Sequence, residues 1–551
     1  MEKNLKGHEQ HEDHDADDVK KRPGHAKPEV NIAATGPTQA ALDAAARAAL
    51  ENPFVQTYLK GSSYRLLSIA VVENAVERKA NHVDCEDQES TSTDHYLATV
   101  YNYTQNNTLL ISGLLSTQGV LGVEESYSQP LPNSEEFQAA IEIVEKDAHF
   151  GPAIREGHLA SRLAMPLLVE EELPDGRVER TLTVALVPNN EQYRYEVVGV
   201  NMIHQKVIRF KGGAPKGSLA NQDLCGEGCL DAQWVPAGTP GQANVTISQG
   251  GTVLWTFRAV RPSASSGKNG SGVELRFVNY RGKRVLYRAH VPILNVQYDK
   301  NLCGPYRDWQ NAEHVFQANG SDVAPGFRLC PTPAKTILDS GSDAGNFGGV
   351  AIYVQGQEVV LVSEMLAGWY RYISEWRFHV DGTIRPRFGF SAVCNPCVCH
   401  LHHHHVYWRL DFDIRTAGDN VVREYNNPPI IGNSHLHTKY QEIRRMRDAS
   451  HQRHWQVENG DTGEGYMILP GSNDGTADSF GGGDLWVLRY HGDELDDGQL
   501  AAPESLDKFV NGEPVYKQDI VLWYGAHFTH DVQNEGANHV VGPDLKPFNW
   551  R

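Results

Sequence analysis

Two kinds of hydrophobic pattern divide the chain. In the first, up to about residue 215, helical and strand-like segments alternate. Apolar residues recur at helical spacing in TQAALDAAARAAL, and Asn52-Pro53 ends that pattern. SEEFQAAIEIVEKD is a second amphipathic helix, with Ser134 as its expected cap. Runs such as YRLLSIAVVE, HYLATVYNYT and RTLTVALVP read as strands. The mixture predicts one or two small α+β domains.

The second pattern begins after KGGAPKGSLANQ, a passage rich in Gly, Pro and Ser. Short β-branched and aromatic runs then follow at regular spacing, among them TVLWTFRAV, GVELRFVNY, KRVLYRAHV, WYRYISEWRFHV and DIVLWYGAHF. Apart from a short helical pattern between residues 441 and 448, helices are nearly absent. Such spacing predicts a large antiparallel β-sandwich. The fold class is therefore one or more N-terminal α+β domains followed by a β-sandwich.

We expect four parts along the chain. Residues 1–35 are polar, rich in His and acidic residues, and lack hydrophobic periodicity, which predicts a disordered tail. Residues 36–95 form a small α+β segment, residues 96–215 an α+β domain, and residues 230–551 the sandwich.

Composition excludes several classes of partner. The chain has 551 residues and a net charge of −19, with no basic stripe, so we expect no nucleic-acid partner. No stretch approaches the roughly 18 apolar residues that span a bilayer, so we expect no membrane partner. The N-terminal segment lacks the apolar core of a signal peptide. A cytoplasmic location is expected, with secretion as the alternative.

Five of the eight cysteines form two clusters, Cys225 with Cys229, and Cys394 with Cys397 and Cys399; Cys85, Cys303 and Cys330 are scattered. Eight cysteines in a chain of this length do not predict a disulfide scaffold. Together the clusters could form a zinc site, although their spacings match no standard pattern. Small buried thiols are the favoured alternative.

The segment CNPCVCHLHHHHVYWRLDFD, at residues 394–413, carries five histidines ahead of a strand-like run. It is internal and is interrupted by Leu401, unlike a purification tag. Alternate side chains of a strand share a face, so an H-x-H pair can present two imidazoles to one metal ion. The spacing admits three pairs, and each needs a third histidine from elsewhere: His400 with His402, His402 with His404, or His403 with His405.

This region resembles the copper amine oxidases, in which an H-x-H pair precedes R-L-D-x-D. Counting back from Arg409 implies that the copper pair is His402 and His404. The family's third copper histidine lies in a D-I-V-L-W-Y…T-H segment. DIVLWYGAHFTH places it at His530, and LKPFNW near the C-terminus also fits. The resemblance spans most of the chain, and residues 96–215 resemble a small α+β domain of the family.

The resemblance also implies a peripheral calcium site. Its positions are the two aspartates of R-L-D-x-D with the carbonyl between them, and an aspartate and a carbonyl eleven residues before the third histidine. In this chain they are Asp411, Phe412, Asp413, Asp519 and Ile520. Carboxylate and carbonyl oxygens suit Ca²⁺.

Family members convert a tyrosine of an N-Y-D/E-Y motif into topaquinone. GWYRYISEW implies that the precursor is Tyr370, followed by Tyr372. Trp369 stands where the family has Asn, and Arg371 stands where it has an acidic residue. Both flanking positions shape the cofactor pocket. Arg371 beside a cofactor would repel an ammonium substrate, unless it pairs with Glu375 four residues on.

Two more roles follow from the resemblance. Tyr298 in NVQYD matches the tyrosine that hydrogen-bonds the quinone. The catalytic base should be an aspartate about fourteen residues later, but ungapped counting reaches Ala312. Asp308 and Glu313 are the neighbouring candidates for this general base.

Three functions remain open at this point. The first is oxidation of a primary amine by O2 to an aldehyde, ammonia and hydrogen peroxide, through a quinone made from Tyr370. The second is a mononuclear copper oxidase or oxygenase with unmodified Tyr370, acting on a non-amine substrate. The third is a catalytically inactive copper-binding relative. In the enzymatic cases the partners are a small molecule and O2, and the family implies a homodimer.

Overall fold

The computed structural model describes residues 26–71, 94–172, 178–190, 192–210, 225, 241–261, 271–299, 303, 305–307, 313–492, 506–530 and 539–551. Most of the predicted tail, residues 1–25, lies outside these ranges. Residues 29–35 were assigned to that tail, but they form strand β1 (Glu29–Thr35) and pair with β10 of the sandwich.

The first small domain consists of two helices and a four-stranded sheet in the order β2-β3-β4-β5. Its elements are α1 (Gln39–Glu51), α2 (Pro53–Leu59), β2 (Tyr64–Val71), β3 (His95–Asn102), β4 (Asn107–Leu114) and β5 (Gly119–Ser126). The helix predicted between residues 38 and 50 is confirmed, with Thr38 as its cap. The boundary expected at residue 95 falls between β2 and β3, which pair in one sheet.

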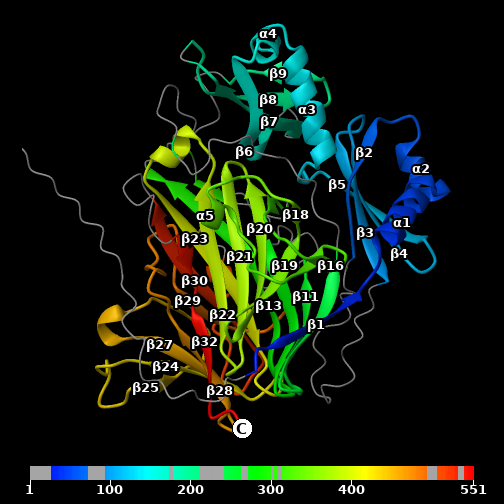
Figure 1. Cartoon of the computed structure of the whole chain (residues 1–551). Helices are drawn as coiled ribbons and strands as arrows, with labels where there is room; N and C mark the ends of the chain where they lie inside the picture. The colour runs from blue at the N-terminus through cyan, green and yellow to red at the C-terminus, as the bar shows by residue number, and fades with distance from the viewer. Residues whose placement is uncertain are drawn as a thin grey trace, which may run out of the picture.

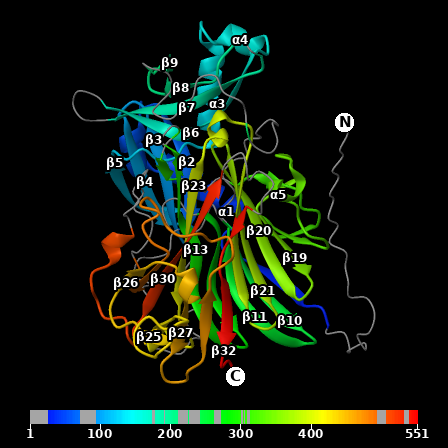
Figure 2. The ribbon, with the colours of Figure 1, turned by 90° about the vertical axis from the view of Figure 1, so that its left-hand side faces the viewer.

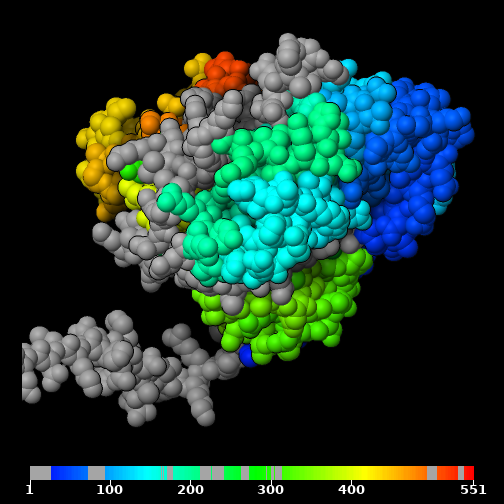
Figure 3. Space-filling model, turned by 90° about the horizontal axis from the view of Figure 1, so that it is seen from above, coloured from blue at the N-terminus to red at the C-terminus, as the bar shows by residue number. Residues whose placement is uncertain are grey.

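The second small domain packs two helices on a sheet in the order β6-β7-β8-β9. Its elements are α3 (Ser134–Lys146), α4 (Gly151–Arg155), β6 (Leu159–Glu172), β7 (Val178–Pro188), β8 (Glu196–Asn201) and β9 (Lys206–Ile208). The predicted helix forms, but its cap is Asn133, whose side chain accepts from the Glu136 amide; Ser134 is the first helical residue. The second small domain lies at one end of the sandwich, and the first lies beside the sandwich near that end (Figures 1 and 3).

The remainder is the predicted β-sandwich. One sheet runs β1-β10-β11-β12-β13-β23-β30-β29-β26, with β14 on β13. Its strands, in that order, are Glu29–Thr35, Gln242–Gln249, Thr252–Val260, Ser271–Tyr280, Lys283–Tyr298, His402–Phe412, Ile520–His530, Leu485–Arg489 and Ile443–Arg445, and β14 is Pro305–Arg307. The helix expected between residues 441 and 448 is wrong, because Ile443–Arg445 forms edge strand β26.

The second sheet runs β16-β17-β19-β20-β21-β22-β32-β28-β27-β24-β25, with β31 on β22. These strands, in that order, are Ser321–Ala324, Phe327–Cys330, Val350–Gln355, Glu358–Ala367, Tyr370–His379, Ile384–Ala392, Asp544–Phe548, Gly465–Leu469, His454–Asn459, Asn420–Tyr425 and Leu436–Thr438, and β31 is Val540–Val541. The shorter elements are β15 (Val315–Phe316), β18 (Phe347–Gly348), α5 (Ile337–Ser340), η3 (Pro396–Cys399), η4 (Ala449–His451) and η5 (Asp507–Phe509).

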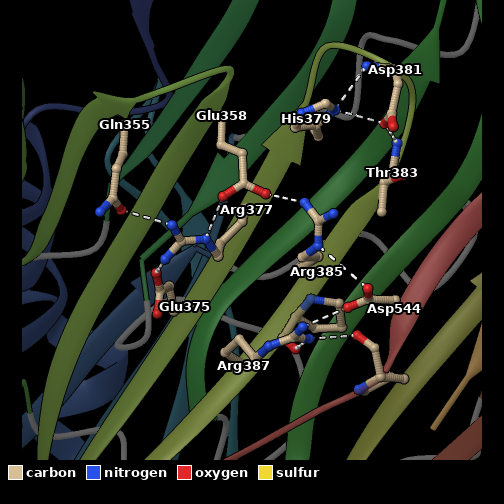
Figure 4. Close-up of polar contacts among 12 residues, drawn as sticks. Gln355, Glu358, Glu375, Arg377, His379, Asp381, Thr383, Arg385, Arg387 and Asp544 are labelled. Atoms are coloured by element: carbon tan, nitrogen blue, oxygen red, sulfur yellow. Dashed lines mark hydrogen bonds and ion pairs between the residues drawn. The ribbon is translucent and has the colours of Figure 1, made fainter. Parts of the chain in front are cut away.

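The two sheets pack face to face and enclose one large hydrophobic core (Figures 1 and 2). Because successive strand residues alternate in direction, each strand sends every second side chain into this core. The other face of β21 carries polar side chains. There Arg377 of β21 pairs with Glu358 of β20 and with Glu375 (Figure 4).

Cysteine chemistry differs from the prediction. Cys225 bonds to Cys399 and Cys303 bonds to Cys397, and Cys394 is also disulfide-bonded. The predictions of a zinc site and of buried thiols are wrong for Cys225, Cys394, Cys397 and Cys399, because their sulfurs are used in disulfides. Cys229 lies outside the described residues. These two disulfides link η3, the short helix before β23, to Cys225 and Cys303. Among the described residues, Cys330 is a free, buried thiol.

Candidate metal centre

Three histidines converge where β23 and β30 pair in the first sheet. His402, the first residue of β23, lies directly opposite His530, the last residue of β30. His404 follows two positions later and shares the face of His402. One ligand nitrogen from each lies within 4.8 Å of the others, and all three residues are buried. The alternating strand pattern and the antiparallel register thus build the trio.

The trio suits a transition-metal ion. Burial lowers the pKa of His402 to about 3 and that of His404 well below its usual value, so both imidazoles are neutral and offer lone pairs. The His402 Nδ1–H donates to the His400 carbonyl (2.5 Å), which turns Nε2 towards His530. The buried Nε2 of His404 makes no hydrogen bond within the described part of the chain. An imidazole nitrogen held in this way fits a copper or zinc ion.

Tyr370 points its hydroxyl at this trio from the opposite sheet. The side chain is fully buried, and its Oη contacts His402 Nε2 and lies 3.2 Å from His530 Nδ1. Its ring meets the His404 ring edge-on, with centroids 4.5 Å apart. Tyr372 stacks on Tyr370 at 5.3 Å and places its own hydroxyl 3.3 Å from His404 Nδ1. The phenol oxygen of Tyr370 therefore lies beside the ligand nitrogens.

A tight hairpin positions Tyr370. Ala367 of β20 pairs with Tyr370 of β21, leaving only Gly368 and Trp369 in the turn. Gly368 has φ +57°, as required at the first central position of a type II′ turn. The turn thereby fixes where the tyrosine enters the core.

Tyr298 and Trp369 form a second aromatic wall of the site. Tyr298, on β13, pairs directly with His402 on β23, and their rings stack with centroids 4.7 Å apart. The Trp369 indole N–H donates to the Tyr298 hydroxyl at 2.9 Å. Trp369, which stands where the family motif has Asn, therefore hydrogen-bonds Tyr298, the tyrosine that the resemblance assigns to cofactor binding.

The Arg371 side chain does not face the Tyr370 site, contrary to the expectation from the motif. The two are consecutive in β21, so their side chains leave on opposite faces of the sheet. Arg371 is fully buried and makes two hydrogen bonds to Asp343, at 2.6 and 2.9 Å. The expected partner, Glu375, pairs with Arg377 instead (Figure 4). Arg371 therefore presents no cation to the tyrosine site.

A separate cluster of carboxylates lies at the other end of β23. Oxygens of Asp411, Asp413 and Asp519 come within 4.8 Å of one another. Arg409 lies 3.3 Å from the Asp411 carboxylate. Phe412 and Ile520 adjoin these aspartates, on β23 and at the start of β30. All five residues of the expected calcium site thus gather at one place in the first sheet.

Comparison with known proteins gives the fold. No protein-family model matches the chain, and no curated protein matches it. Solved structures do match, with probability 1.00. An amine oxidase from Aspergillus nidulans has a TM-score of 0.56 and 14% identity, over 96% of this chain and 90% of that one. A lysyl oxidase from Pichia pastoris has a TM-score of 0.55 and 12% identity, over 96% and 92%.

A copper-containing benzylamine oxidase from Hansenula polymorpha is similar at a TM-score of 0.54 and 13% identity, over 82% of this chain and 88% of that one. The chain has the fold of the copper amine oxidases. This likeness confirms the predicted fold class, in which α+β structure precedes a large antiparallel β-sandwich. At these identities the likeness establishes the fold alone, so any activity has to rest on the residues of the site.

The copper amine oxidase fold leaves the base unassigned. Asp308 lies outside the described residues. Glu313 is buried and its carboxylate is held by Arg261, with Nε at 3.0 Å from Oε1. Glu313 bridges to Met365 of β20, which in turn pairs with Tyr372. Glu313 therefore lies near β21, but its carboxylate is paired with Arg261.

Further polar groups surround the trio. His539 is buried, and its ring centroid lies 4.8 Å from that of His530, the same separation as between His402 and His530. Among the extra histidines, His405 contacts His527 at 2.8 Å and His403 contacts Thr529 at 3.0 Å. His314, Asp343 and Glu364 form a third cluster. His539 and the cluster of His314, Asp343 and Glu364 belong to no spaced motif, because each is completed by residues distant in the chain. His403 and His405 form the third H-x-H pair of the run, but their contacts are with Thr529 and His527.

Among the described residues, none of the helices has the length and apolar character needed to cross a membrane.

Proposed function

We propose that this chain is a copper-dependent oxidoreductase that oxidises a primary amine with O2 and water to an aldehyde, ammonia and hydrogen peroxide. Tyr370 is the precursor of its quinone cofactor. The observation that carries the proposal is the Tyr370 hydroxyl, which lies against His402 and His530 inside a closed core. A phenol held at a three-histidine site is placed for oxidation of its own ring.

The metal is copper in this proposal, held by His402, His404 and His530. Copper supplies one-electron redox chemistry with O2 at the tyrosine ring. The likeness to a copper-containing benzylamine oxidase supports this choice over zinc, which has no redox chemistry.

The protein's own residues orient the cofactor and exclude water. Tyr372 stacks on the Tyr370 ring and restricts its rotation. Tyr298 is held by Trp369 at 2.9 Å and stacks on His402, so its hydroxyl is fixed beside the trio. Phe390 covers His404 with a stacked ring at 4.7 Å. Full burial of Tyr370 keeps bulk water from the reacting ring.

The general base is Asp308 or Glu313. Such a base must accept a proton from the carbon next to the amine nitrogen. Both carboxylate oxygens of Glu313 contact the guanidinium of Arg261. We propose comparing Asp308→Asn with Glu313→Gln. The variant that loses turnover while keeping the quinone chromophore identifies the base.

A second function is supported by Trp369. It stands where the family motif has Asn, and its indole N–H donates to the Tyr298 hydroxyl oxygen at 2.9 Å. If that contact prevents modification, Tyr370 stays a tyrosine. The site is then a mononuclear copper oxidase or oxygenase for a non-amine substrate, or a copper-binding relative without activity.

Calcium is the proposed occupant of the second metal cluster, with Asp411, Asp413 and Asp519 as carboxylate ligands and Phe412 and Ile520 as carbonyl ligands. Three carboxylates within 4.8 Å support this choice, since Ca²⁺ prefers oxygen donors. Titrating chelated protein with Ca²⁺ should raise its thermal midpoint, and Asp413→Asn should reduce that rise.

The assembly and location are also proposals. We retain the homodimer implied by the family, which light scattering would test. The disulfides Cys225–Cys399 and Cys303–Cys397 favour an oxidising compartment over the expected cytoplasmic one, because the cytosol keeps thiols reduced.

The deciding experiment for the proposed function is direct. Copper-loaded protein, prepared under air, is treated with phenylhydrazine and digested. A labelled peptide containing residue 370 supports the amine oxidase. Bound copper without an adduct supports the second function.

A further inference from the structure

A buried cluster of side chains of metal-ligating types lies on the face of the β20–β21 sheet opposite to the Tyr370 side chain. It consists of His314, Asp343 and Glu364, none of them more than 1% exposed. One ligand atom from each lies within 4.8 Å of the others. Glu364 is on β20, where it shares a face with Leu366, the partner of Arg371, and not with Ala367, the partner of Tyr370. The cluster and the histidine trio therefore lie on opposite faces of one sheet.

The backbone fixes these three side chains in place. The His314 amide donates to the Glu364 carbonyl at 2.8 Å, which attaches the histidine segment to β20. The His314 ring lies between the carboxylates, with Nδ1 3.3 Å from Glu364 Oε1 and Nε2 3.7 Å from Asp343 Oδ1. Three segments that are far apart in the sequence thus present donors to one point.

The two carboxylate oxygens of Glu364 differ in their contacts. Its Oε2 accepts from the Ile337 amide at 2.9 Å, which directs Oε1 into the cluster. Within the described part of the chain this buried Oε1 makes no hydrogen bond. A buried carboxylate oxygen with no hydrogen bond is unfavourable unless a cation lies beside it.

Two carboxylates share this cluster, and the only group within ion-pair distance of Glu364 among the described residues is the His314 ring. Arg371 binds both oxygens of Asp343 and so neutralises that residue. A divalent ion would offset the desolvation of the ionised carboxylate. Its donors would be one imidazole and two carboxylates, which is a set that zinc, manganese and ferrous ions accept.

We propose that His314, Asp343 and Glu364 bind a second divalent transition-metal ion, distinct from the proposed copper and calcium sites. This ion links the segment before β15, the loop after α5 and strand β20. Arg371 connects the ion to the tyrosine hairpin, because its guanidinium binds Asp343 and also donates to the Gly368 and Tyr370 carbonyls at 3.2 and 3.0 Å. The ion thereby stabilises the turn that holds Tyr370, without touching the reacting ring.

The test measures zinc on full-length protein whose copper and calcium sites are already filled. Chelated protein receives one equivalent of Cu²⁺ and excess Ca²⁺, and is then titrated with Zn²⁺ and assayed by elemental analysis. We expect one further zinc per chain. Glu364→Gln keeps the size of the side chain and its acceptor for Ile337, and should weaken zinc binding at least about tenfold, while copper content is unchanged.

Two further variants make the result decisive. His404→Ala should lose copper and keep the additional zinc, so failure of the copper proposal would not affect this one. His314→Gln should remove imidazole nitrogen couplings from the EPR spectrum of Mn²⁺ bound at the site. The proposal is overturned if wild-type protein takes up no zinc beyond the filled sites. Equal zinc affinity in wild type and Glu364→Gln would also overturn it.

Discussion

Tyr370 and Arg371 are consecutive residues whose side chains lie on opposite faces of β21. The tyrosine hydroxyl reaches the histidine trio, whereas the guanidinium is buried on the other face against Asp343. The motif position at which a cation was expected beside the tyrosine therefore forms a buried ion pair on the other face of the sheet. Repulsion of an ammonium substrate by Arg371 is not a feature of this site.

The Arg371–Asp343 pair should contribute strongly to stability. Removing one partner of a buried pair leaves the other charge uncompensated, so Arg371→Met should lower the free energy of unfolding by about 3–5 kcal/mol. The partly exposed pair of Arg377 and Glu358 in Figure 4 provides the matched control. Arg377→Met should lower the free energy of unfolding by about 1 kcal/mol or less. Urea unfolding of chelated protein measures both. Adding Asp343→Leu to Arg371→Met should restore stability; equal effects of the two arginine variants would contradict the account.

Copper binding should depend on His404 and not on its neighbour. His404→Ala removes one imidazole of the trio and should abolish stoichiometric copper. His403→Ala is the control, because that ring lies on the other face of β23 and contacts Thr529. Elemental analysis of both purified variants gives the comparison. Full copper in His404→Ala would show that a different pair of the histidine run binds the metal.

Trp369 and Tyr298 should be energetically coupled. Their hydrogen bond is 2.9 Å long and buried. Trp369→Phe and Tyr298→Phe each remove one partner, and the double variant removes both. The cycle of unfolding free energies should give a coupling of roughly 1 kcal/mol. Strictly additive effects would mean that the indole does not hold the Tyr298 hydroxyl.

Acid should destabilise the fold through Glu424. Burial alone would raise its pKa, but hydrogen bonds from Arg445 and Asn426 and the charge of Lys439 hold the pKa at about 2. Because the folded pKa is depressed from 4.5, the stabilisation is complete above pH 4.5 and is lost as the pH falls towards about 2. The loss amounts to roughly 3 kcal/mol.

Glu424→Gln tests that prediction, since it removes the titrating group and keeps the shape. Unfolding free energies over the same acidic range should fall less steeply in the variant than in wild type. Identical slopes would show that other carboxylates control acid stability.

Local pattern predicted the sandwich, and the resemblance to the copper amine oxidases pointed to the three histidines that the structure brings together. The alternation of a strand places His402 and His404 on one face, and RLDFD fixed which pair of the run to choose. β1 was missed because EVNIAAT becomes a strand only by pairing with β10, more than 200 residues later. The helix proposed after residue 441 failed for a similar reason, since that segment completes a sheet edge on β29.

Long-range partners explain the remaining differences. Asp343 is 28 residues from Arg371 and carries no spacing signal, so the nearer Glu375 was chosen. The cysteines pair across 174 and 94 residues, which cluster spacing does not reveal. Similarly, His314 and Glu364 meet only because the segment before β15 bonds to β20.

The most direct measurement of the central claim is the fate of Tyr370 in copper-loaded protein exposed to air. The account predicts a visible chromophore, a phenylhydrazine adduct on the peptide containing Tyr370, and loss of both in Tyr370→Phe but not in Tyr372→Phe. An unmodified Tyr370 in protein that holds one copper per chain would contradict it.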